Sequence, residues 1–194
     1  MTRPSTKDEL RNGKPTRQEF RGLPRNPVYL MLDGLKCFHN VGTILRLADA
    51  LLVTKVFLCG DTVNPFGKKT RKGSRGAERW VEWEQRDDTV TVIYELKEQG
   101  VSIVSAEIAA ESMDYRDYDL QLPVCFVLGR EDIGVSPEVL SLSDSIVHLP
   151  IFGMTNSLNV STVAAVLLYE VVRRAEVRAS NELRTSDVLV ISGS

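Results

Sequence analysis

Three small polar residues, Ser157, Asn159 and Ser161, stand at the entrance of an otherwise apolar helical pattern late in the chain. They follow a short apolar run, Ile146 to Ile151, which predicts a buried strand, and a glycine-containing loop at 152–156. Ser and Asn side chains cap helices well and can also reach a ligand. Strand, polar loop and helix together are typical of a ligand site at the carboxyl end of a sheet strand. The spacing alone fits an ordinary strand-to-helix connection equally well.

Two other stretches place polar side chains directly after apolar runs. Asn40 and Arg46 lie six positions apart where a helical pattern follows a predicted strand, and Glu131 lies in the turn GREDIG at 129–134. The glycine spacing of that turn differs from the GxGxxG fingerprint of dinucleotide-binding proteins, and the chain has no GxxxxGK[ST] phosphate loop. The sequence therefore argues against a Rossmann nicotinamide enzyme and against a nucleotide hydrolase.

Apolar strands alternate with helical patterns along most of the chain. This alternation predicts an α/β fold with a largely parallel sheet and helices on both faces. We expect a long loop from Asp61 to Gly76. We expect a short strand-like run from Ala77 to Trp83, whose two tryptophans pack under a loop more readily than they stack on bases. The expected strands lie at 28–32, 56–60, 101–106, 123–128 and 146–151, and the expected helices at 41–52, at 89–99, from residue 137 and after the 152–156 loop.

The length of 194 residues, with 43% hydrophobic and 26% charged residues, fits one soluble globular domain. We expect that domain at 28–174, after a basic extension at 1–27 with short helical turns near 7–12 and 16–21. In the C-terminal tail at 175–194, a small apolar run at 188–191 could add to a sheet edge, dock on a partner or stay loose.

No apolar run approaches the roughly 20 residues of a membrane span, and the N-terminus lacks the apolar core of a secretion signal. We therefore expect a cytoplasmic protein without membrane contact. Cys37, Cys59 and Cys125 have no metal-ligand spacing and are predicted to be reduced and mostly buried. The two histidines, His39 and His148, do not suggest a metal site either.

Basic charge is concentrated in two segments of a chain whose formal net charge is −2. Residues 1–25 hold seven basic and three acidic side chains, net +4, and residues 68–79 hold six basic and one acidic, net +5. Such clusters are usually solvated surface, but two of them in a near-neutral chain favour a phosphate-backbone partner. The predicted RNA-binding residues of the second segment are Lys68, Lys69, Arg71, Lys72 and Arg75.

The three polar stretches together resemble the sequence motifs of the SpoU/TrmH family of RNA ribose 2′-O-methyltransferases, within the SPOUT superfamily. LPIFGMTNSLNVSTVAAVLLYE at 149–170 is similar to the third motif, NVGTILR at 40–46 to the first, and LGREDIGVS at 128–136 to the second. The resemblance implies methyl transfer from S-adenosylmethionine to a ribose 2′-hydroxyl. The stretches TRKGSRGAERWVEW and MDYRDYDL look closer to the TrmH branch, which methylates a guanosine in the D loop of tRNA.

Ribosomal RNA as substrate, or a non-catalytic RNA-binding role, remains an alternative. The resemblance also implies a deep trefoil knot in the C-terminal third, which is an exception to the rule that chains do not thread loops, and a homodimer. The polar site residues that it implies are Asn40, Arg46, Glu131, Ser157 and Asn159, and the implied wall of the cofactor pocket is Ala106, Gly129, Leu149, Ile151 and Leu158.

In the family, the arginine at the position of Arg46 activates the 2′-hydroxyl with help from a substrate phosphate. A guanidinium is a poor base, however, and suits phosphate binding and stabilisation of a developing alkoxide better. Asn40 and Asn159 are expected to orient the ribose and Arg46. Glu131 is expected to hold the motif loops together, and Ser157 to cap the last helix as well as line the site.

Overall fold

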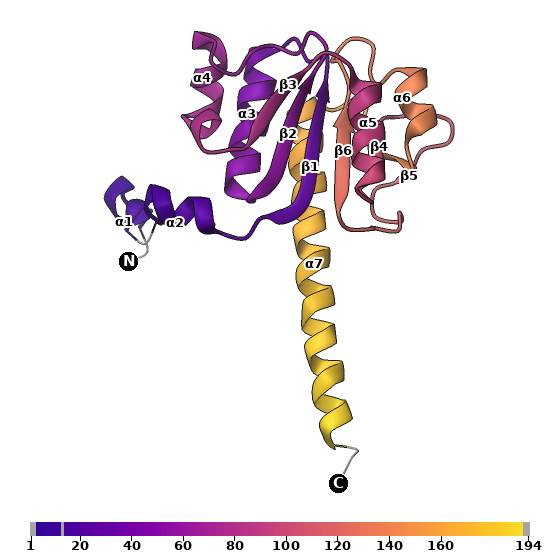
Figure 1. The fold of residues 1–194 in the computed structure, drawn as a ribbon. Helices are drawn as coiled ribbons and strands as arrows, with labels where there is room; N and C mark the ends of the chain where they lie inside the picture. The colour runs from indigo at the N-terminus through magenta and orange to yellow at the C-terminus, as the bar shows by residue number, and fades with distance from the viewer. Residues whose placement is uncertain (1–2, 13, 192–194) are drawn as a thin grey trace.

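The structure is a computed structural model that describes residues 3–12 and 14–191, with side chains described as far as Ala175 except those of Lys7 and Arg17. Within this part of the chain, seven strands form one sheet in the order β3-β2-β1-β6-β4-β7-β5, and every neighbouring pair is parallel. The predicted α/β fold with a parallel sheet is confirmed (Figure 1). The strands are β1 (Asn26–Asp33), β2 (Val53–Cys59), β3 (Trp83–Arg86), β4 (Ser102–Ala106), β5 (Met113–Asp114), β6 (Val124–Leu128) and β7 (Ser145–His148).

The interior strand β1 is apolar on both of its faces. Val28, Leu30 and Leu32 belong to one buried cluster, whereas Met31 belongs to a second cluster on the other side of the sheet. A parallel strand covered on both faces reads as a continuous apolar run rather than an alternating one. This explains why the run at 28–32 could be identified as a strand from its composition.

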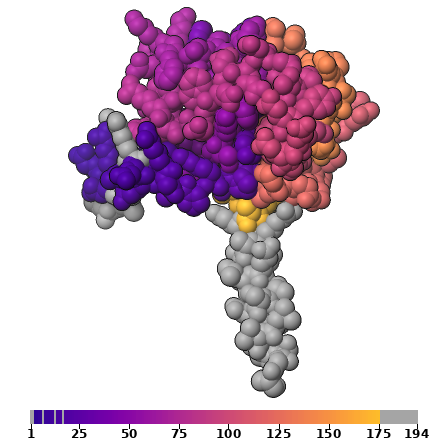
Figure 2. All heavy atoms as spheres, in the orientation of Figure 1, coloured from indigo at the N-terminus to yellow at the C-terminus, as the bar shows by residue number. Residues whose placement is uncertain are grey.

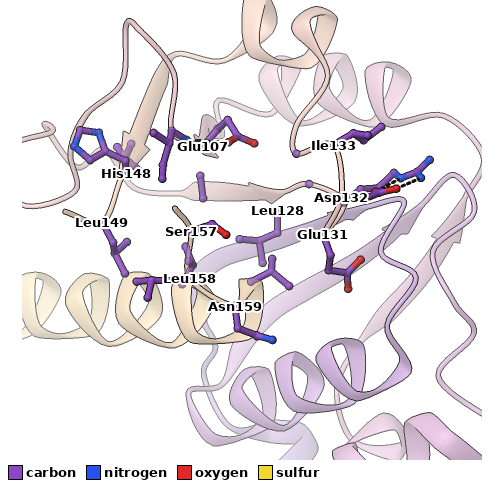
Figure 3. A pocket seen from close by; sticks show the side chains of 18 of the residues that line it. Glu107, Leu128, Glu131, Asp132, Ile133, His148, Leu149, Ser157, Leu158 and Asn159 are labelled. Atoms are coloured by element: carbon purple, nitrogen blue, oxygen red, sulfur yellow. Dashed lines mark hydrogen bonds and ion pairs between the residues drawn. The ribbon is translucent and has the colours of Figure 1, made fainter. Parts of the chain in front are cut away.

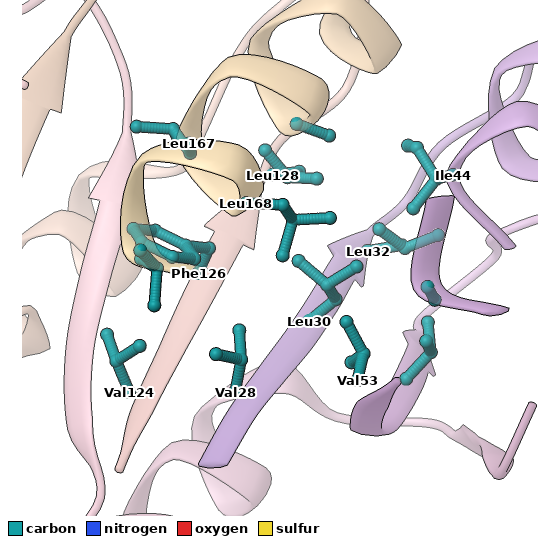
Figure 4. Close-up of a cluster of buried hydrophobic side chains, with 14 of the residues drawn as sticks. Val28, Leu30, Leu32, Ile44, Val53, Val124, Phe126, Leu128, Leu167 and Leu168 are labelled. Atoms are coloured by element: carbon teal, nitrogen blue, oxygen red, sulfur yellow. The ribbon is translucent and has the colours of Figure 1, made fainter. Parts of the chain in front are cut away.

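Helices cover both faces of the sheet, as predicted. On one face, α3 (Phe38–Ala50) and α7 (Val160–Ile191) pack together over β1 and β6, where Figure 4 shows Ile44, Leu167 and Leu168 meeting the strand side chains. On the other face, α5 (Thr89–Glu98) and α6 (Pro137–Leu142) supply buried side chains to the second cluster. The ends of α3 and α7 that point to the carboxyl edge of the sheet therefore lie close to each other.

The expected loop from Asp61 to Gly76 is wrong for residues 68–74, which form helix α4 (Lys68–Ser74). This helix crosses α3 where Gly42 faces Gly73, and a Cβ atom added at Gly42 would lie 2.5 Å from the carbonyl oxygen of Thr70. Packing at this crossing stabilises a helix whose Lys- and Gly-rich sequence has no apolar periodicity.

The expected strand-like run from Ala77 to Trp83 is also wrong, because it begins with a 3₁₀ turn, η1 (Ala77–Arg79), and strand β3 starts only at Trp83. The buried carboxylate of Glu78 accepts a hydrogen bond of 2.5 Å from Ser74 Oγ and so holds the turn against α4. The prediction that the tryptophans pack is confirmed, since Trp83 donates to the Glu78 carbonyl at 3.0 Å and meets the Phe66 ring edge to face.

The N-terminal extension contains the two short helices that were expected, α1 (Lys7–Arg11) and α2 (Arg17–Gly22). A capping box precedes each of them, in which a threonine and the glutamate three residues later satisfy each other's backbone N–H groups. The Phe20 ring packs edge to face on Trp80 at 6.3 Å, so α2 contacts the domain beside η1. Figure 2 shows this arm projecting from the body of the domain.

Helix α7 continues past Arg174 to Ile191, so the apolar run at 188–191 is helical, and its side chains lie outside those described. Cys59 and Cys125 are buried as expected, whereas Cys37 is exposed because it precedes α3 at the rim of the sheet. No helix in the described part of the chain is long and apolar enough to cross a membrane.

Candidate active site

A cavity of about 480 Å³ opens at the carboxyl ends of β4, β6 and β7 (Figure 3). The loop at 129–134 forms one side of it, and the segment leading into α7 forms another. All five residues of the predicted cofactor wall line this cavity: Ala106, Gly129, Leu149, Ile151 and Leu158. The five residues that the family resemblance marked therefore share one cavity. Their role in cofactor binding stays a prediction.

The two glycines of the GREDIG turn are explained by close backbone approach. A Cβ atom at Gly129 would lie 2.3 Å from the backbone of Gly134, and Gly134 itself has a φ of +71°. Arg130 and Gly134 exchange backbone hydrogen bonds of 3.2 and 2.9 Å across the turn. Only glycine permits this closed loop, which fixes where Glu131 stands.

One chain of hydrogen bonds links the three stretches that the motifs marked. Asn159 Nδ2 donates to Asn40 Oδ1 at 3.0 Å, and Asn40 Nδ2 donates to Glu131 Oε1 at 2.9 Å. The Glu131 carboxylate also accepts the backbone N–H groups of Lys36 and Cys37, at 3.1 and 3.2 Å. The network therefore joins α3, the 129–134 loop and the start of α7 at the rim of the cavity.

The network also determines the charge state of Glu131. Partial burial raises the pKa of this carboxyl group, but hydrogen bonds from Asn40 and from the backbone N–H groups of Lys36 and Cys37 lower it further, so the net shift is below the ordinary value. Asn40 is only 3% exposed and its amide is engaged on both sides. Both residues are thus placed to hold the site together.

Two local expectations are corrected here. Asn40 was expected in a loop before α3, but it lies in the first turn of that helix, which starts at Phe38. Ser157 was expected to cap the last helix, but α7 starts at Val160 and Asn159 caps it, accepting from the Ser161 N–H at 2.9 Å. A cap must directly precede the first helical residue, and Ser157 stands too early, exposed on the cavity wall.

Arg46 lies apart from the network. Six residues at about 100° each turn its side chain roughly 240° around α3 from that of Asn40. Arg46 is exposed, does not line the cavity, and makes no hydrogen bond or ion pair with any described residue. The structure therefore places Glu131, Ser157 and Asn159 on the cavity wall, joins Asn40 to two of them by hydrogen bonds, and leaves Arg46 open to solvent.

The predicted RNA-binding residues lie on or next to α4, and all five are exposed. Because α4 packs on α3, this basic surface stands on the helix that carries Arg46. Lys69 is also held 5.7 Å above the Phe38 ring at the start of α3.

Four cavity residues with titratable side chains were not predicted as site residues: Glu107, Arg130, Asp132 and His148. Glu107 directly follows the predicted strand at 101–106, so its position at a strand end could have marked it. His148 was expected inside the strand at 146–151, and the structure makes it the last residue of β7. His148 Nδ1 lies 2.9 Å from Ser112 Oγ, and Glu107 accepts the N–H of Val135 at 2.8 Å.

Comparison with known proteins identifies the family to which the chain belongs. The model of the SpoU rRNA methylase family matches residues 27–169, which is well over half of the chain. The chain belongs to this family. The first two motifs, the third motif up to Tyr169 and every cavity-lining residue named above fall within the matched range.

Relatives of this SpoU family member include two tRNA (guanosine(18)-2′-O)-methyltransferases. The enzyme of Aquifex aeolicus is 34% identical over 147 residues, which cover 74% of this chain and 68% of the enzyme. The enzyme of Escherichia coli K12 is 33% identical over 153 residues, which cover 78% of this chain and 65% of the enzyme. The chain therefore spans about two thirds of the length of these relatives.

Solved structures agree with this family. The TrmH/SpoU tRNA-modifying enzyme of A. aeolicus has a TM-score of 0.73 at 30% identity and covers 84% of both chains. An rRNA methyltransferase from Sinorhizobium meliloti, solved with S-adenosylmethionine bound, has a TM-score of 0.72 at 28% identity over 80% of this chain and 60% of its own.

Proposed function

We propose that this SpoU family protein transfers a methyl group from S-adenosylmethionine to a ribose 2′-hydroxyl of tRNA, at a guanosine of the D loop. The observation that carries the proposal is the meeting of Asn40, Glu131 and Asn159 at the rim of one cavity, although 119 residues separate Asn40 from Asn159. The activity named for the A. aeolicus and E. coli relatives supports the choice of tRNA.

The cavity fits this cofactor chemically. Its wall combines apolar side chains such as Leu149 and Ile151 with three carboxylates, of Glu107, Glu131 and Asp132. One basic group, Arg130, is paired with Asp132 at 2.8 Å, so the remaining charge at the wall is negative. When bound, the cofactor supplies a methyl group on a sulfonium, whose sulfur is a good leaving group. An apolar, negatively charged cavity suits such a cation and disfavours a nucleoside phosphate.

The other steps, which are RNA binding, orientation of the ribose and positioning of the loops, fall to different residues of the site. Arg46 is free to bind a phosphate of the RNA and to stabilise the alkoxide that develops at the 2′-oxygen. Asn159 and Ser157 stand between the cavity and the solvent, where they can orient the ribose. Asn40 and Glu131 act as positioning residues, because their hydrogen bonds hold α3 against the motif loops. Rate enhancement comes mainly from alignment, since the leaving group needs little help.

The proposal includes the finer features that the family resemblance implies. The return of α7 across the sheet to pack on α3 supports a threaded, knotted C-terminal third. Exposed apolar side chains in the loop after β7, Phe152 at 91% and Met154 at 100%, support a homodimer that covers them. Residues 28–174 form the methyltransferase unit between the basic extension at 1–27 and the tail at 175–194. We propose the cytoplasm as the location, because tRNA is used there.

The test is transfer of labelled methyl groups to unmodified tRNA and, separately, to unmodified ribosomal RNA. We expect label in tRNA, recovered as an alkali-resistant dinucleotide. Arg46→Ala should lower the rate at least about 100-fold, as loss of an electrostatic stabiliser does. Its affinity for S-adenosylhomocysteine should stay within about twofold, because Arg46 does not line the cavity. Arg116→Ala, another exposed arginine, is the matched control.

Three outcomes would contradict the proposal in different ways. Label only in ribosomal RNA would move the substrate to the ribosome. Cofactor binding without label in either RNA would favour a binding protein. Full activity of Arg46→Ala would remove that residue from the catalytic site.

A further inference from the structure

Glu107 is the first residue after strand β4 and lines the cavity. Its backbone N–H donates to the Val147 carbonyl at 3.0 Å, which extends the pairing of β4 with β7 by one residue. Its side chain reaches across to the 129–134 loop. In Figure 3, Glu107 lies on the opposite side of the cavity from Asn159.

The Glu107 carboxylate is fixed by neutral donors. One oxygen accepts the Val135 N–H at 2.8 Å and the other accepts the Ile108 N–H at 2.9 Å. The turn at Gly134 fits closely around this group, since a Cβ atom there would lie 2.2 Å from Glu107 Oε2. The position of the carboxylate is therefore set before any ligand enters.

No ion pair within the described part of the chain neutralises Glu107. Of the other cavity carboxylates, Asp132 is neutralised by Arg130 at 2.8 Å, whereas Glu131 keeps its charge and accepts three hydrogen bonds from neutral donors at the rim. His148 is held by Ser112. Glu107 and Glu131 are thus the two cavity carboxylates that no ion pair within the described residues neutralises, and Glu107 is the one that lies away from the hydrogen-bonded rim.

We propose that Glu107 recognises the positive charge of the methyl donor and makes the cavity prefer the cationic donor over its neutral-sulfur product. This inference rests on the proposed function, because it concerns the same cavity and cofactor. S-adenosylmethionine carries a net charge of +1, whereas S-adenosylhomocysteine, which has lost the methyl group and the sulfonium charge, is neutral overall. A carboxylate in a partly desolvated site distinguishes two such ligands on the order of tenfold in affinity.

The competing interpretation is that Glu107 only closes the 129–134 loop. Both roles predict weaker ligand binding when the side chain is truncated. Only charge recognition predicts a loss of affinity that depends on the charge of the ligand. Glu107→Gln separates them, since the amide oxygen of glutamine can still accept the Val135 N–H while the negative charge and the hydrogen bond from Ile108 are lost. Loss of the Ile108 hydrogen bond should affect all ligands alike, whereas loss of the charge should affect only the cations.

The experiment measures the affinity of three ligands by calorimetry for the full-length wild type and for Glu107→Gln. The ligands are S-adenosylmethionine, S-adenosylhomocysteine and sinefungin, an analogue whose amine carries a positive charge in place of the sulfonium. We expect Glu107→Gln to weaken both cations about tenfold and the neutral product by less than about threefold. Asp132→Asn is the matched control, because it removes a carboxylate of the same cavity that Arg130 already neutralises. Asp132→Asn should change the ratio of the affinities for S-adenosylmethionine and S-adenosylhomocysteine much less than Glu107→Gln does.

The wild type provides a second measurement that does not depend on the folding of a variant. Its preference for S-adenosylmethionine over S-adenosylhomocysteine should decrease as salt rises from about 0.01 to 1 M, because salt screens charge. An equal loss for all three ligands in Glu107→Gln, or no loss, overturns the inference. Wild-type protein that binds neither adenosyl ligand overturns the proposed function as well, whereas selective binding without RNA methylation overturns the proposed function alone.

Discussion

At the scale of single residues, the site depends on side chains that satisfy one another. Asn40 bridges Glu131 and Asn159, and Glu131 in turn accepts two backbone N–H groups before α3. A buried amide such as Asn40 costs free energy if its partners are removed, so each member of the network depends on the others. The contribution of the Glu131 charge to stability can be tested by changing the pH.

We expect Glu131→Gln to lower the free energy of unfolding near neutral pH by on the order of 1 kcal/mol, after allowance for solvent screening of this exposed carboxylate. Because the folded-state pKa of Glu131 lies below its ordinary value, its contribution is present above the unfolded pKa and is lost as pH falls through the folded value. The difference between wild type and variant should therefore be constant above about pH 5.5 and shrink below about pH 4.5. Urea unfolding at several pH values measures it.

Glu111→Gln, at an exposed loop glutamate, serves as the control for this titration. A difference that stays constant down to pH 3 would show that the charge of Glu131 contributes nothing to the network. The role of Asn40 would then rest on neutral hydrogen bonds alone.

Sequence reasoning could find the members of this network but not their contacts. The motifs marked Asn40, Glu131 and Asn159, and the strand-end rule brought their loops to one edge of the sheet. Which of them touch depends on the strand order, in which β6 lies between β1 and β4, and no spacing in the sequence reveals that order. Arg46 could be identified as exposed only once the start of α3 was known.

At the scale of elements, the sequence predicted what apolar patterns determine. The strand at 28–32 and the helix at 89–99 appear within two residues of their expected limits, because burial alone specifies them. Helix α4 could not be found in this way, since it is stabilised by its contact with α3 and its own sequence reads as a basic loop. Its placement rests on two glycines that look unremarkable in the sequence.

We expect Gly42→Ala to destabilise the protein by about 1–3 kcal/mol, because the added methyl group would meet the Thr70 carbonyl oxygen at 2.5 Å and push α4 away from α3. Displacement of α4 should also weaken RNA binding while the affinity for S-adenosylhomocysteine changes little. Thermal unfolding and RNA binding would measure the two effects. Gly22→Ala is the control, since a Cβ atom there meets nothing within 4 Å. Equal unfolding temperatures for the two variants would mean that α4 can move away from α3 with little loss of stability.

At the scale of the whole molecule, acidic and basic residues gather on different parts of the structure, one suited to cofactor binding and the other to RNA binding. The cavity wall is acidic, whereas α4 and the N-terminal arm are basic, although the chain as a whole has a net charge of −2. A cationic cofactor and a polyanionic RNA can therefore be drawn to different parts of one small surface. Arg46 is exposed on α3, the helix that also supports α4.

This separation predicts that RNA affinity and cofactor affinity respond to different substitutions. Each lost phosphate contact lowers the slope of log affinity against log salt by roughly 0.7 for single strands and 0.9 for a B-form DNA duplex. We expect Lys72→Ala, at an exposed position of α4, to reduce that slope by about one and to weaken binding of different RNA sequences uniformly. The affinity for S-adenosylmethionine should not change, because Lys72 does not line the cavity.

Lys97→Ala is the matched control, since Lys97 lies on α5 and pairs with Asp144 at 2.6 Å on the opposite face of the sheet. Filter binding of tRNA at salt concentrations from about 0.05 to 0.3 M measures both slopes. If the slope of Lys72→Ala matched that of the wild type, α4 would not contact phosphate, and the N-terminal arm would have to supply the electrostatic attraction. If Lys97→Ala lowered the slope as much as Lys72→Ala, the attraction would come from total charge rather than from this surface, and the separation of the two tasks would not hold.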